Sequence, residues 1–176
     1  MNYYPYGPIE IPLTKRRIEH RNKLPLNELW DNFDEIHKGI SDSVGCYIFS
    51  IRAGKGIRPW YVGMAEKQSF RKECFTPHKL LNYNDCLNQR KGTPVLTLIP
   101  KFTKTKRLAG RGVNGHRDIR FLENLLISHC LQRNPELLNI KSTKLLKELV
   151  LPGVINTPKG RTKEDIKAFQ KLIGTS

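Results

Sequence analysis

Two tyrosines, each close to a glycine, stand in two short segments that together predict a β-hairpin. Segments 45–51 and 57–63 are rich in β-branched and aromatic residues, and a turn containing glycine and lysine joins them. If the turn is symmetric about Gly54, Tyr47 lies directly opposite Tyr61 and both phenols project from one face of the sheet. A bulge in the turn would shift this register. An ordinary aromatic cross-strand pair is the alternative interpretation.

A carboxylate in a later segment is the third candidate for chemistry. The apolar pattern predicts a long helix over about 118–133. Glu123 shares a stripe of this helix with apolar residues that include Ile119 and Ile127. A carboxylate on a buried stripe is costly unless a cation or a metal compensates its charge. The alternative is a glutamate at the edge of the stripe that reaches water or pairs with Arg120.

The charge of the chain indicates its class of partner. The 176 residues contain 31 Lys and Arg against 16 Asp and Glu, a net charge of +15. Such a surplus attracts polyanions, of which nucleic acid is the commonest, although a basic surface of ribosomal type is an alternative. A mean hydropathy of −0.50 is typical of a soluble globular protein. No apolar run approaches the roughly 20 residues that span a bilayer, and no secretory signal is evident, so we expect no membrane partner and a cytoplasmic location.

The N-terminal region predicts an arm followed by a helix. Residues 1–25 contain four prolines and the basic run Lys15-Arg16-Arg17, which indicate an extended basic arm. Asn27 is a candidate cap for a helix that runs to about Lys38. Its apolar stripe consists of Leu29, Trp30, Phe33 and Ile36.

The remaining elements follow from similar local signals. We expect a short helix over 67–74 and a third strand over 93–103, whose prolines suit an edge position. Two C-terminal helices are predicted near 142–150 and 162–173, with Ser142 and Thr162 as caps. The fold class is therefore α/β (α+β), with a small, mainly antiparallel three-stranded sheet flanked by helices.

Taken together, these residues resemble the GIY-YIG nuclease superfamily. Gly45-Cys-Tyr47 and Tyr61-Val-Gly63 are similar to the two halves of its signature, at the family's short spacing. Arg71 follows ten residues after Tyr61, where the family has an arginine at the start of a helix. The segment from Glu123 to Asn139 is similar to the family's metal-binding glutamate and structural asparagine. The resemblance covers about residues 44–140, and it divides the chain into a basic arm (1–25), a nuclease core with a preceding helix (26–140) and a C-terminal helical extension (141–176).

The resemblance implies hydrolysis of a phosphodiester with one divalent ion, Mg²⁺ or Mn²⁺. Glu123 would hold the ion, which suits Mg²⁺ because Mg²⁺ keeps several waters. Tyr61 would help to deprotonate the attacking water, which requires cationic neighbours for a phenol with a pKa of about 10. Tyr47 would hydrogen-bond the phosphate or the water, and Arg71 would neutralise charge in the transition state. Asn139 would be structural.

Two positions depart from the family pattern. Met64 stands where many members have a lysine, for which Lys67 or Lys72 are possible substitutes. Phe75 stands where the family usually has His or Tyr, and it can transfer no proton. His78, three residues later, is a candidate for that role, with an ordinary loop histidine as the alternative.

A basic, glycine-containing loop over 104–117 precedes the helix of Glu123. We interpret this loop as a DNA clamp that makes non-specific phosphate contacts. Its cations are Lys104, Lys106, Arg107, Arg111 and Arg117. The expected function is a metal-dependent DNA endonuclease. The alternatives are a catalytically weak or inactive nucleic-acid-binding module on the same scaffold, and a nuclease directed at RNA.

Overall fold

The computed structural model describes residues 1–19, 24–139, 143–157, 160 and 162–174. Its centre is an antiparallel sheet in which β3 (Gly45–Ala53) lies between β4 (Gly56–Ala65) and β5 (Thr93–Phe102). These are the three predicted strands, and their antiparallel pairing is confirmed. The sheet is larger than predicted, however, since the order β1-β5-β3-β4 includes a strand from the N-terminal arm.

The N-terminal arm supplies two strands to this sheet. Both β1 (Asn2–Tyr3) and β2 (Tyr6–Glu10) pair with the side of β5 that faces away from β3. The prediction that β5 is an edge strand is therefore wrong. The prolines of the arm predict an extended chain, but they do not predict which strand it pairs with.

The β3–β4 hairpin has a different register from the predicted one. Gly54 and Lys55 form a two-residue connection, and Tyr47 lies opposite Gly63 rather than Tyr61. The register shifts between Phe49 and Ser50, where β4 carries one additional residue. Tyr61 and Gly63 are two positions apart on β4, so Tyr47 and Tyr61 still share one face of the sheet.

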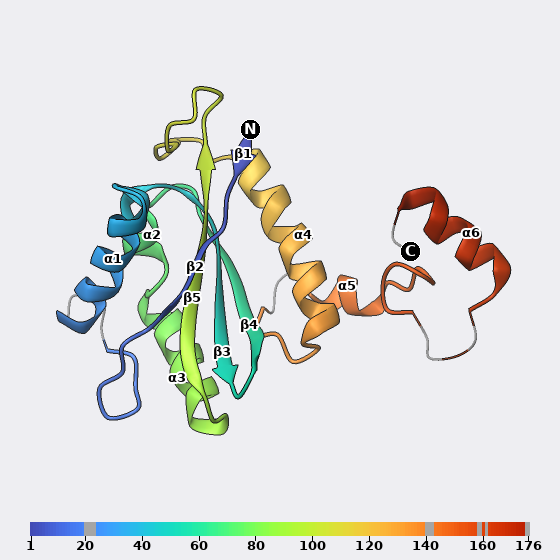
Figure 1. The fold of residues 1–176 in the computed structure, drawn as a ribbon, viewed down its shortest axis with the longest axis horizontal. Coiled ribbons are helices and arrows are strands. Elements are labelled where there is room, and N and C mark those ends of the chain that lie inside the picture. Colours follow the sequence, from blue (N-terminus) through green and yellow to red (C-terminus); the bar gives the residue numbers. More distant parts are fainter. Residues whose placement is uncertain (20–23, 140–142, 158–159, 161, 175–176) are drawn as a thin grey trace.

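Helices cover both faces of the sheet (Figure 1). On one face, α1 (Leu24–Ile36), α2 (Phe70–Glu73) and α3 (Pro77–Gln89) bury side chains against alternate residues of β3, including Tyr47. On the other face, α4 (Arg117–Arg133) packs against the intervening residues, including Cys46. This alternation is the normal consequence of the two-residue period of a strand.

The helices of the first half of the chain differ from the predicted ones in two respects. The first helix begins at Leu24, with Pro25 in its first turn, so Asn27 is not its cap. Its Leu29, Trp30 and Phe33 are buried as expected, but Ile36 is exposed. The second difference is α3, which was not predicted as a helix.

The C-terminal helices α5 (Thr143–Glu148) and α6 (Glu164–Ile173) lie beyond α4, away from the sheet (Figure 1). The cap of α6 is Lys163 rather than Thr162, whereas the predicted cap Ser142 lies outside the described residues. None of the described helices has the length and apolar character needed to cross a membrane.

Candidate active site

Tyr47 forms the buried floor of the candidate site. Its side chain has no exposed surface, and its ring centroid lies 6.2 Å from that of Tyr61. Gly63, directly opposite, makes room for this ring, because a Cβ at position 63 would clash with the Tyr47 hydroxyl. Among the described residues, the hydroxyls of Tyr47 and Tyr83 have no well-formed hydrogen-bond partner. Burial raises the pKa of Tyr47 well above its ordinary value, so this phenol is neutral at physiological pH.

Tyr61 lies closer to the surface, on the edge strand β4, and its side chain is partly exposed. Burial, followed by the negative charges of Glu123 and Glu73, raises the pKa of Tyr61 to about 12. The phenol therefore keeps its proton at neutral pH unless positive charge is brought close to it. The charge of Glu123 thus acts on the phenol of Tyr61.

Glu123 projects from α4 and is the partly buried carboxylate of this environment. It forms no hydrogen bond or ion pair with any residue that the structure describes, and Arg120, its predicted alternative partner, binds Glu66 instead. Burial raises the pKa of Glu123, the positive charge of Lys79 opposes this shift, and two neighbouring carboxylates increase it. These neighbours are Glu66 and Glu73. The charge of Lys79 therefore offsets only part of the cost of burying this carboxylate.

Arg71 lies on α2, as predicted, but its guanidinium is directed toward α1. It lies 3.4 Å from the carboxylate of Asp34, donates a hydrogen bond to the hydroxyl of Ser41 over 3.1 Å, and covers the ring of Trp30. In the described part of the chain, no hydrogen bond, ion pair or ring contact joins Arg71 to the two tyrosines or to Glu123. The contacts that position the Arg71 side chain are therefore with Asp34, Ser41 and Trp30.

Phe75 and His78 differ sharply in their surroundings. Phe75 is fully buried and packs edge-on against Trp30 and Tyr83, so it is a core residue. His78 is exposed in the first turn of α3. Within the described ranges, it makes no hydrogen bond or ion pair, and nothing attaches it to the tyrosines.

Lys79 is a site residue that the sequence reasoning missed. Its side chain is 11% exposed, and its Nζ donates hydrogen bonds to the carbonyl oxygen and the carboxylate of Glu73, over 2.7 and 2.5 Å. The same Nζ lies 5.3 Å from the centroid of the Tyr47 ring. The signal that could have revealed it is the helical spacing of Lys79, Tyr83 and Leu87, which places the lysine on the buried stripe of α3.

Asn139 binds the exposed edge of the strand that carries Tyr61. Its Oδ1 accepts a hydrogen bond from the Val62 N–H over 2.9 Å, and its Nδ2 donates to the Val62 carbonyl over 2.7 Å. Leu138 adds a backbone hydrogen bond to the carbonyl of Trp60. The segment after α4 thus covers the free edge of β4 and fixes the backbone next to Tyr61.

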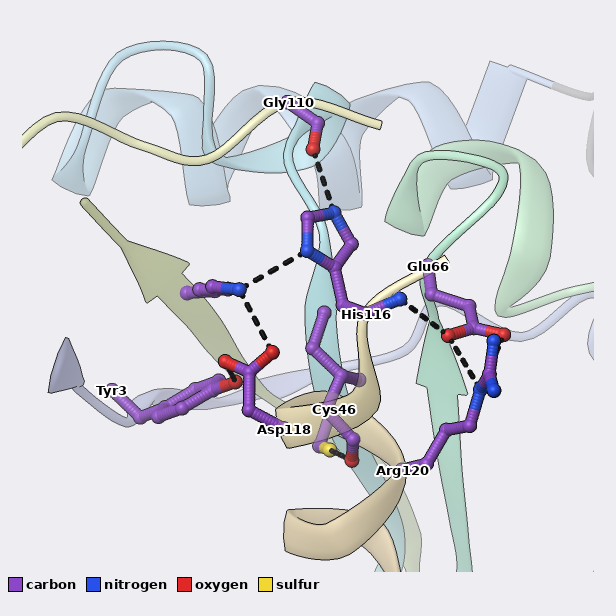
Figure 2. Close-up of polar contacts among 9 residues, drawn as sticks. Tyr3, Cys46, Glu66, Gly110, His116, Asp118 and Arg120 are labelled. Carbon is purple, nitrogen blue, oxygen red and sulfur yellow. Dashed lines mark hydrogen bonds and ion pairs between the residues drawn. The ribbon is translucent and has the colours of Figure 1, made fainter. Parts of the chain in front are cut away.

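The loop over 104–117 is tethered at its base rather than free. Figure 2 shows that the Glu66 carboxylate accepts hydrogen bonds from the His116 amide and from Arg120, over 2.8 and 3.0 Å. Burial acts to raise the pKa of Glu66, but these hydrogen bonds and the charge of Arg120 hold it below its usual value. The five predicted cations of the loop are all exposed, namely Lys104, Lys106, Arg107, Arg111 and Arg117.

A second tether joins the loop, α4 and the N-terminal arm (Figure 2). Asp118 accepts hydrogen bonds from the Tyr3 hydroxyl over 2.6 Å and from the Lys101 ammonium over 2.8 Å. The His116 ring lies between Lys101 and the carbonyl oxygen of Gly110, at 3.0 and 3.1 Å. With Lys101 as donor to Nδ1, the proton of a neutral His116 lies on Nε2. The exposed cations therefore sit on a loop with a fixed base.

Glu66 links this loop to the candidate site. It is close enough to Glu123 to raise the pKa of that carboxylate, and it holds the end of the basic loop through His116. Among the described residues, no group of three or more His, Cys, Asp or Glu side chains is placed to hold a metal ion. The resemblance implies that one carboxylate, Glu123, holds the ion, so a group of three such side chains is not expected at this site.

Searches against models of known protein families, curated proteins and solved structures found no match to this chain.

Proposed function

We propose that this chain is a GIY-YIG-type endonuclease that hydrolyses phosphodiester bonds of DNA with the help of one divalent ion. The observation that carries the proposal is the partly buried carboxylate of Glu123, which forms no hydrogen bond or ion pair with any described residue. Its negative charge contributes to the raised pKa of the Tyr61 phenol. Glu66, whose charge acts on Glu123, also holds the base of a loop whose cations face solvent. A carboxylate, a phenol and a basic surface are the parts that phosphodiester hydrolysis requires.

The residues present fit a hard divalent cation. Among the described residues, the Glu123 carboxylate has no hydrogen-bond or ion-pair partner, and the charges of two further carboxylates, Glu66 and Glu73, act on it. Mg²⁺ accepts one carboxylate and retains waters in its remaining positions, and Mn²⁺ has similar ligand preferences. Such an ion would supply charge neutralisation at the phosphate.

The two tyrosines are assigned different roles by their burial. Tyr61 is partly exposed and can receive a hydrogen bond from the attacking water at its phenol oxygen. Tyr47 has no exposed surface, so we assign it to holding Tyr61 in place rather than to touching the substrate. The net charge of +15 and the loop cations would draw the DNA backbone toward this surface.

The direct test is incubation of purified protein with supercoiled plasmid and Mg²⁺, with EDTA in a parallel reaction. The proposal predicts nicked or linear DNA with Mg²⁺ and intact plasmid with EDTA. Cleavage that survives EDTA, or no cleavage of any DNA substrate, contradicts it. An RNA of matching sequence in the same assay distinguishes a DNA-directed from an RNA-directed nuclease.

A second candidate function is a nucleic-acid-binding module without efficient catalysis. Two features favour it. Arg71, to which the resemblance assigns charge neutralisation, is paired with Asp34, and a buried phenylalanine that can transfer no proton, Phe75, stands where the family usually has His or Tyr. Binding of a labelled duplex, measured by anisotropy, together with an unchanged plasmid in Mg²⁺, is the result that this candidate predicts.

A further inference from the structure

Among the buried polar residues that the structure describes, Lys79 is the only one with a charged side chain. The others are Ser, Thr and Asn, which are neutral. Removing an ammonium group from water costs several kcal/mol unless nearby groups compensate for the lost hydration. A sequence with many surface lysines has no general need to bury one, so the position of Lys79 requires a specific reason.

The contacts of Lys79 place its ammonium at the centre of the candidate site. Two N–H groups bind Glu73, and the ammonium lies 5.3 Å from the Tyr47 ring, within the range of a cation–π contact. The third N–H has no hydrogen-bond partner among the described residues. The charge of Lys79 also acts to lower the pKa of Glu123.

Arg71, on the neighbouring helix α2, has different contacts from Lys79. Its guanidinium binds Asp34 and Ser41, and nothing in the described chain joins it to Tyr47, Tyr61 or Glu123. Of the two cations, Lys79 is therefore the one that contacts a residue of the candidate site, the ring of Tyr47.

We propose that Lys79, rather than Arg71, supplies the positive charge that contacts the scissile phosphate. This inference rests on the proposed nuclease function. Glu73 holds the ammonium in place through two hydrogen bonds, and the third N–H is free to bind a phosphate oxygen between Tyr61 and Glu123. A fixed cation at this position stabilises charge that develops in the transition state without reorganisation during the reaction.

The alternative is a purely structural lysine that closes the C-terminal end of α2 through the carbonyl of Glu73. Substitutions at positions 79, 73 and 71 separate the two roles. Lys79→Met and Arg71→Met remove a charge and keep an unbranched side chain. Glu73→Gln removes the charged partner of Lys79 and keeps the ammonium.

The experiment measures single-turnover cleavage of a labelled duplex in Mg²⁺ and equilibrium binding of the same duplex in Ca²⁺, which is expected to support binding without cleavage. For Lys79→Met we expect a loss of rate of about 10²- to 10³-fold, as for removal of one fixed oxyanion donor, and a change in Kd below about threefold. Lys79→Arg should recover at least about tenfold of the lost rate, since it restores the charge. Arg71→Met should stay within about tenfold of the wild-type rate. Glu73→Gln, which keeps the ammonium and the backbone carbonyl partner, should lose less rate than Lys79→Met.

Three results would overturn the inference. A Lys79→Met rate close to that of the wild type shows that Lys79 is not required. An equal loss in Glu73→Gln shows a structural pair, and a larger loss in Arg71→Met returns the role to the arginine. If the wild type and Lys79→Met cleave at the same rate, the proposed nuclease function stands and only the role of Lys79 is overturned. If the wild type does not cleave, both the nuclease function and the role of Lys79 are overturned.

Discussion

Replacement of Asn139 by alanine should destabilise the protein by an amount that can be worked out from two hydrogen bonds. The Asn139 side chain pairs with both the N–H and the carbonyl of Val62, at 2.9 and 2.7 Å, and these contacts are buried. Because β4 is an edge strand, no other strand satisfies these two backbone groups after the substitution. Each orphaned buried group costs about 1–3 kcal/mol, so we expect a loss of about 3 kcal/mol in the free energy of unfolding.

Urea unfolding followed by far-UV circular dichroism measures this loss, and a thermal melt should show a Tm lower by roughly 6–12 °C for a chain of this size. The matched control is Asn124→Ala, which removes an exposed asparagine from α4 and should change stability by less than about 0.5 kcal/mol. An Asn139→Ala protein with the stability of the control would refute the reasoning, because it would show that the edge of β4 does not depend on this side chain.

Three further substitutions test separate parts of the site. Gly63→Ala places a methyl group against the Tyr47 hydroxyl and should cost about 1–3 kcal/mol in urea unfolding. Glu66→Gln weakens the hydrogen bond that holds His116, so trypsin should cut the basic loop several-fold faster than in the wild type. Because the pKa of Glu66 is lowered in the folded protein, the ionised carboxylate stabilises the fold above about pH 4.5. This stabilisation is lost as the pH falls through the pKa of Glu66 in the folded state. Glu123→Gln should raise stability at pH 7.5 by about 0.5–2 kcal/mol, because the raised pKa of Glu123 makes its ionised form unfavourable in the folded protein, and this gain should shrink toward pH 4.

Each of these has a result that would count against it. If Gly63→Ala has the same urea midpoint of unfolding as the wild type, Tyr47 can move away from the added methyl group without loss of stability. An unchanged trypsin pattern in Glu66→Gln would place the tether elsewhere. A Glu123→Gln protein that is less stable than the wild type at pH 7.5 would show that the carboxylate has a stabilising partner.

Local patterns in the sequence predicted the central elements well. The strands β3, β4 and β5 are confirmed, because β-branched and aromatic residues are frequent in them. The long helix α4 is confirmed as well, and Ile119 and Ile127 of its apolar stripe are buried. By contrast, α3 was missed since asparagine and aspartate occur repeatedly along it and favour turns over helices. Missing α3 also hid the burial of Lys79.

The remaining differences depend on partners far away in the sequence. The arm forms β1 and β2 only because β5 offers a free side some 90 residues later, which no local signal reveals. The hairpin register depends on an additional residue in β4, so the direct pairing of Tyr47 with Tyr61 could not be derived from turn length alone. The direction of the Arg71 side chain is set by Asp34, on a helix that the motif does not include.

The most direct measurement of the central claim compares the Mg²⁺-dependent single-turnover cleavage rates of the wild type and of Glu123→Gln on the same duplex. The substitution keeps the shape of the side chain and removes the charge that would hold the ion. We predict a fall in rate of at least about 10³-fold, equivalent to about 4 kcal/mol of barrier, in a protein that remains folded. Cleavage by Glu123→Gln at the wild-type rate would contradict the assignment of a metal-dependent nuclease site to this carboxylate.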